Sequence, residues 1–142
     1  MALAIDIADA VVAELAGGAF SVPITPVRRV LPEYELADLK DLRVTVVPTS
    51  VEIEGASRAV CQHDVRVDIG IQKKLGKALD TQVAPLCGLV EEINEFLKRR
   101  PLAATPYAVW VRSANEPIYA ADHLAEQRAF TSVLSVTYRA MR

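Results

Sequence analysis

The chain has 142 residues, 51% hydrophobic and 24% charged, a size and composition typical of one domain with a packed core. We therefore expect a single domain over residues 1–142 that needs no disulfide or metal to fold. The net charge of −2 and only two local basic clusters argue against nucleic-acid binding as the main role. We expect no signal peptide and no membrane span, because acidic residues interrupt the first apolar run and no stretch reaches about 20 apolar residues.

The first predicted element is a helix over residues 5–16, where apolar side chains recur every four positions and Gly17-Gly18 follow as a stop signal. Between residues 19 and 42, three prolines interrupt the pattern and argue against a central strand. Within this stretch, residues 27–31 fit an edge strand and residues 34–42 fit a short helical turn.

The strongest strand signal covers residues 59–72, where apolar and polar side chains alternate. One face carries Cys61, His63, Val65, Val67, Ile69 and Ile71, and the other carries Gln62, Asp64, Arg66 and Asp68. One buried and one solvated face is typical of an antiparallel sheet that is covered on one side. Two shorter strands are predicted before it, at residues 43–47 and 51–54, ended by Pro48 and Gly55 respectively.

A second amphipathic helix is predicted over residues 82–99. Its start is constrained by Pro85, because proline is tolerated only in the first turn of a helix. Pro101 follows its basic C-terminal end.

After the second helix, the sequence again shows the alternation typical of strands. Residues 107–113 alternate, with Trp110 and Arg112 on one face, and residues 130–140 form a long last strand. The polar connection between them contains a predicted helical turn near residues 121–126. This order of elements predicts an α+β fold: a mainly antiparallel, four- to five-stranded sheet with two main helices packed on one face.

Candidate catalytic or metal-binding residues are few. Cys61 and His63 lie two positions apart, as a thiolate–imidazole pair or two metal ligands would, or simply as interior neighbours. A common zinc site needs about four ligands, and the chain has two cysteines and two histidines. We predict no catalytic, cofactor-binding or metal-binding residue. Two buried thiols are the simpler interpretation of Cys61 and Cys87, with a disulfide between them left open.

Three other features, two of them charged and one aromatic, allow a structural and a functional interpretation. Asp122-His123 is interpreted as a solvated loop pair rather than part of a triad, because adjacent residues rarely orient each other in that way. The alternating charges of the long strand fit a surface ladder, or a surface that meets a neighbouring subunit or a tube lumen. Trp110 fits a core anchor or an interface residue.

The layout resembles that of the tail terminator (tail completion) proteins of long-tailed bacteriophages and prophages. The resemblance lies in a helix "IADAVVAELA" followed by Gly18 and Phe20, a strand ending in Val46-Val47-Pro48, the strand "HDVRVDIGIQKKL", the helix "LVEEINEFLKRRPL" and the last strand "AFTSVLSVTYRAMR".

This resemblance implies a non-enzymatic protein without a cofactor, whose copies form a hexameric ring. The ring would cap the tail tube and contact the tube protein and head or neck proteins, first in the bacterial cytoplasm and then in the virion tail. Closed rings need head-to-tail interfaces, and exposed sheet edges are natural places for them. We therefore predict Val51 and Ile53 as oligomer-interface residues.

Two alternatives stay open. A head–tail connector or neck component would have the same layout. A small enzyme or ligand-binding α+β domain would use Cys61, His63 or His123, and substitution of these residues would abolish its activity.

Overall fold

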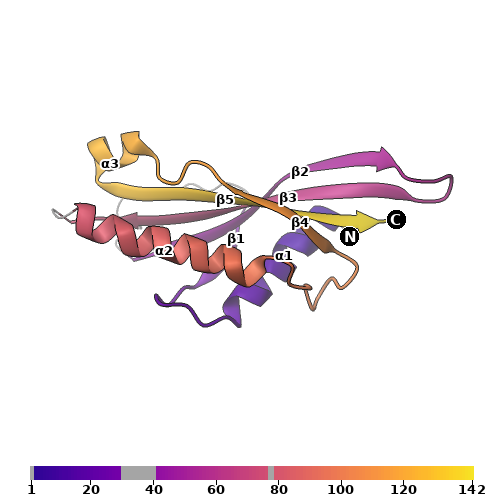
Figure 1. Cartoon of the computed structure of the whole chain (residues 1–142), viewed down its shortest axis with the longest axis horizontal. Coiled ribbons are helices and arrows are strands. Elements are labelled where there is room, and N and C mark those ends of the chain that lie inside the picture. Colours follow the sequence, from indigo (N-terminus) through magenta and orange to yellow (C-terminus); the bar gives the residue numbers. More distant parts are fainter. Residues whose placement is uncertain (1, 30–40, 77–78) are drawn as a thin grey trace.

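The computed structural model describes residues 2–29, 41–76 and 79–142, and Figure 1 shows the whole chain. Its elements in chain order are α1 (Leu3–Ala16), β1 (Pro26–Arg28), β2 (Arg43–Gly55), β3 (Cys61–Lys74), α2 (Leu79–Leu97), β4 (Val109–Asn115), α3 (Ala121–Gln127) and β5 (Ala129–Met141). The α+β class is therefore confirmed, and the predicted turn near residues 121–126 is the short helix α3. Most of the helical turn predicted at residues 34–42 lies outside the described residues.

The strands form one five-stranded sheet in the order β1-β2-β3-β5-β4. β2, β3, β5 and β4 are joined by three antiparallel pairings, whereas the short β1 runs parallel to β2. The sheet is thus mixed rather than purely antiparallel. At one edge β1 pairs with residues 44–46 of β2, and at the opposite edge β4 pairs with residues 134–139 of β5.

Two helices cover one face of this sheet, as predicted. α1 packs against β1, β2 and β3, and α2 packs against β5 (Figure 1). The predicted apolar face of β3 supplies four fully buried residues to the core: Val65, Val67, Ile69 and Ile71. β5 supplies Phe130, Leu134, Val136 and Tyr138, and the apolar alternation predicted for β3 is confirmed from Val65 to Ile71.

Polar and aromatic contacts join α1 to the end of α2. The carboxylate of Glu14 accepts hydrogen bonds from the Ala103 backbone N–H at 2.9 Å and from Arg100 Nε at 2.8 Å, and both lower its pKa. Phe20 and Phe96 stack with ring centroids 5.4 Å apart, and the Arg100 guanidinium lies over the Phe96 ring. These contacts hold the helical layer together at one end.

The predicted break at Pro48 is wrong. The two short strands expected around it are one continuous strand, β2, with a register shift between Pro48 and Ser50. Pro48 lies just beyond Val46, the last β2 residue that pairs with β1. Among the described residues, no strand pairs with the outer side of β2 at Pro48, and bulges and edges are where proline is tolerated in sheets.

A second bulge corrects the predicted faces of β4. Trp110 pairs with Tyr138 and Arg112 with Thr137, so one residue is inserted between them and they lie on opposite faces. In α2, Pro85 lies inside the helix, because the helix begins at Leu79 rather than near residue 82.

The hairpin of β2 and β3 projects beyond the helices (Figure 1). In β2, the seven residues 49–55 are all exposed, whereas Val44–Val47 are buried. Within the described part of the chain, no helix is long and apolar enough to cross a membrane.

Candidate functional site

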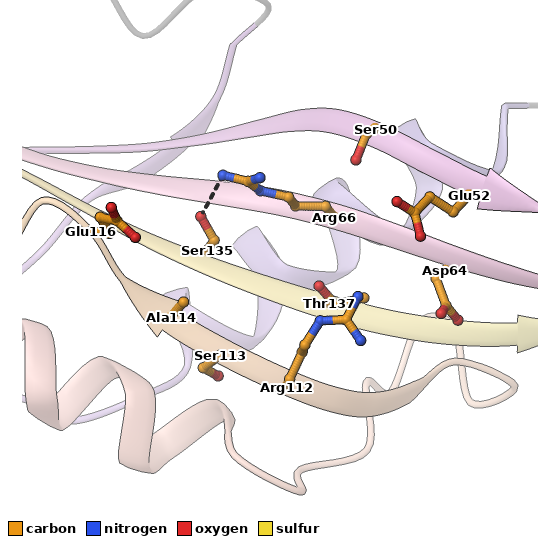
Figure 2. Close-up of a pocket in the computed structure, with 10 residues that line it drawn as sticks. All are labelled: Ser50, Glu52, Asp64, Arg66, Arg112, Ser113, Ala114, Glu116, Ser135 and Thr137. Carbon is orange, nitrogen blue, oxygen red and sulfur yellow. Dashed lines mark hydrogen bonds between the residues drawn. The ribbon is translucent and has the colours of Figure 1, made fainter.

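The face of the sheet opposite α1 and α2 is polar and hollowed. We call it the open face; it carries the even-numbered residues 62–68 of β3 and their neighbours on β2, β4 and β5. It contains a hollow of about 450 Å³, shown in Figure 2. The hollow is lined by Ser50, Glu52, Asp64, Arg66, Arg112, Ser113, Ala114, Glu116, Ser135 and Thr137.

Asp64 is the most buried charged group of the open face, with 8% of its surface exposed. Arg139 of β5 donates from Nε and Nη2 to its two carboxylate oxygens at 2.9 and 3.2 Å. This bidentate contact lowers the pKa of Asp64, and the charge of Arg112 lowers it further. The carboxylate is therefore held in its ionised form, which is unsuited to a general acid at neutral pH.

Asp68 is also satisfied within the chain. It accepts hydrogen bonds from Arg66 Nε at 3.1 Å and from Ser135 Oγ at 2.7 Å. Arg66 donates a further bond to Ser135 Oγ at 3.0 Å (Figure 2). The alternating charges of β3 thus form the predicted surface ladder, which extends across the sheet to β5.

Glu52 and Arg112 differ from these paired groups. Figure 2 shows Glu52 on the β2 side of the hollow and Arg112 on the β4 side. Both side chains are exposed, and neither forms an ion pair or a hydrogen bond with another described residue. The charges available for a partner therefore lie near the two edges of the sheet.

Cys61 and His63 share a face of β3, as predicted, but both are only partly buried. They lie in the projecting part of the hairpin, so the expectation of two interior neighbours is wrong. On this face, the helices cover β3 from Val65 onward, but not the start of the strand. Both cysteines are free thiols, and the described residues contain no group of three or more potential metal ligands.

His123 lies on α3 rather than in a solvated loop. Its Nδ1 is 2.8 Å from the Thr131 hydroxyl on β5, and the side chain is partly buried. Asp122 beside it is exposed, so the pair has no triad-like arrangement. Trp110 packs against the core and donates from its indole N–H to Ser113 Oγ at 2.9 Å, which fits the predicted anchor.

The predicted interface residues Val51 and Ile53 are exposed on the outer half of β2. They are 39% and 61% exposed and point to the same face as Val65 and His63, their partners on β3. Glu52 and Glu54 alternate with them on the open face. No pattern in the sequence singles out Arg139, because its pairing with Asp64 depends on the register of β3 and β5.

No protein-family model matches the chain, and no curated protein is significantly similar to it in sequence.

Proposed function

We propose that this chain is a non-enzymatic structural protein of a long-tailed bacteriophage or prophage, a tail terminator. Its copies form a ring, of six subunits, that caps the tail tube and joins it to the head or neck. The protein assembles in the bacterial cytoplasm and remains in the virion tail. The proposal starts from the resemblance in sequence layout and is supported by the surfaces of the fold.

The outer half of β2 carries this proposal. An edge strand exposes unpaired backbone N–H and C=O groups, and proteins usually blunt such an edge or cover it with another chain. Here the exposed edge also presents Val51 and Ile53, which are apolar and large. Burial of these two side chains against another copy would favour assembly, since burial of apolar surface is the main driving force of association.

The open face supports a structural rather than a catalytic role. Its most buried carboxylate, Asp64, is held ionised by Arg139, and Asp68 is satisfied by Arg66 and Ser135. An active site usually keeps an acid, base or nucleophile with a pKa tuned to its reaction. Charges that are already paired with one another, as on β3 and β5, are better suited to a rigid surface than to catalysis.

The oligomeric state tests the proposal. Native mass spectrometry and sedimentation velocity over a concentration series should show a species of six 15.5 kDa chains, and electron microscopy should show it on one end of tail tubes. Ile53→Asp should weaken assembly by roughly tenfold or more, because it places a charge in an apolar contact. Ile118→Asp is the matched control, since Ile118 is similarly exposed, at 57%, but lies outside β2.

If the protein stays monomeric at high concentration and does not bind tail tubes, the ring proposal is contradicted. A ring that binds the head connector but no tube end would instead indicate a neck component. Loss of an enzymatic activity in Cys61→Ala or His123→Ala, with the fold intact, would favour the enzyme alternative.

A further inference from the structure

Within the described residues, the sheet has an unpaired stretch of seven residues at each edge. On one side, β1 pairs with Val44–Val46 only, which leaves residues 49–55 of β2 without an outer neighbour among the described residues. On the other side, β4 is seven residues long and, in the part of the chain that the structure describes, pairs with β5 alone. Each edge offers a row of backbone groups to which another strand can bind.

The directions of these edges suit a head-to-tail contact. Three successive antiparallel pairings separate β2 from β4, so the two edge strands run in opposite directions. When two copies lie side by side in the same orientation, β4 of one copy meets β2 of the next as an antiparallel pair. The open faces of both copies then lie on the same side, and the sheet continues across the contact.

The side chains of the two edges are complementary on both faces. On the open face, β2 carries the exposed carboxylates of Glu52 and Glu54, whereas β4 carries the exposed guanidinium of Arg112. On the opposite face, β2 presents Val51 and Ile53, and β4 presents the partly buried Trp110. An isologous contact between two β2 edges would instead bring four carboxylates together, which is unfavourable.

We propose, building on the ring-forming role proposed above, that the partner of the β2 edge is the β4 edge of a second copy, with Arg112 of one copy against Glu52 of the next. Each copy has one edge of each kind, so the contact is heterologous and can propagate until the ring closes. The apolar face of the contact buries Val51 and Ile53, and the charged face fixes its register.

Charge reversal tests this pairing with one variant on each edge. Glu52→Arg and Arg112→Glu each place like charges across every contact, so each alone should raise the concentration needed for half-assembly by at least about tenfold. The double variant E52R/R112E restores an opposite pair at every contact and should recover assembly. Equal amounts of the two single variants should also assemble together, since alternating copies again place Arg against Glu.

Controls separate this contact from a general effect of charge. Glu126→Arg reverses an exposed charge on α3, outside both edge strands, and should assemble like the wild type. Circular dichroism checks the fold of each variant, and the milder Arg112→Gln and Glu52→Gln should give smaller losses in the same direction.

The outcomes distinguish this pairing from the ring itself. A wild-type ring that is unaffected by either reversal, or that is not rescued in the double variant and the mixture, overturns the β2–β4 contact but leaves the ring proposal standing. Sensitivity to E52R with no effect of R112E indicates pairing between β2 edges and also overturns it. A wild type that never assembles overturns both.

Discussion

The inner and outer halves of the β2–β3 hairpin share one sequence pattern but have opposite surroundings. In the inner half, Val46 and Ile69 pair across the strands and are fully buried under the helices. In the outer half, Val51 and Ile53 face the same side of the sheet, yet Ile53 is 61% exposed. The alternation of apolar residues determines which way a side chain points. On the face covered by α1 and α2, the reach of these helices determines whether the side chain is buried.

The largest expected effect comes from matched truncations in the two halves. Ile69→Ala leaves a cavity in the packed core and should lower the free energy of unfolding by about 2–5 kcal/mol. Ile53→Ala removes the same atoms from an exposed site and should change it by no more than about 0.5 kcal/mol in the monomer. Urea unfolding at low protein concentration measures both values.

Similar losses in the two variants would contradict the comparison, because they would mean that the outer half is packed in the monomer. A loss for Ile53→Ala that appears only at high concentration would instead locate its contribution in the contact between copies. Concentration-dependent unfolding therefore sharpens the distinction between core and interface.

The same contrast between packed and exposed sites can be made with two glycines, Gly18 in the helical layer after α1 and Gly55 at the outer end of β2. A Cβ added at Gly18 would lie 2.6 Å from the Phe96 ring and 2.8 Å from the Phe20 ring, whereas one added at Gly55 would have no neighbour within 4 Å. Gly18→Ala should therefore destabilise the fold by about 1–3 kcal/mol, because the aromatic pair must move. Gly55→Ala should have an effect below about 0.5 kcal/mol in thermal or urea unfolding. Equal effects at the two sites would mean that Phe20 and Phe96 can move aside without a measurable loss of stability.

The amino-acid sequence predicts the parts of the fold that depend on local periodicity. The buried face of β3 and the apolar stripe of α1 follow directly from residue spacing. The continuity of β2 through Pro48 does not, because it depends on where β1 stops pairing. Trp110 and Arg112 lie on opposite faces because of a bulge between them, and no residue type at this position predicts that bulge.

In the candidate site, too, residues that depend on a local pattern can be predicted from the sequence, whereas contacts between strands cannot. A short apolar alternation predicts Val51 and Ile53 as edge residues, and both side chains are exposed on the outer half of β2. Asp64 and Arg139 are 75 residues apart in sequence, so their contact requires the register of β3 and β5. Arg112 becomes a candidate only when β4 is known to be the opposite edge of the sheet.

The smallest expected effect concerns the ion pair between Asp64 and Arg139 on the open face. Because Arg139 lowers the pKa of Asp64 in the folded protein, the pair stabilises the fold above the unfolded carboxyl pKa of about 3.9, and this stabilisation is lost as the pH falls through the folded pKa. Asp64→Asn should therefore be less stable than the wild type at pH 7, by less than Gly18→Ala, and the difference should shrink in acid. Urea midpoints measured between pH 7 and pH 2 test this, with Asp122→Asn as the control because Asp122 is exposed and has no ion pair among the described residues. A difference that stays constant down to pH 2 would mean that Asp64 stabilises the outer sheet through its shape and not through its charge.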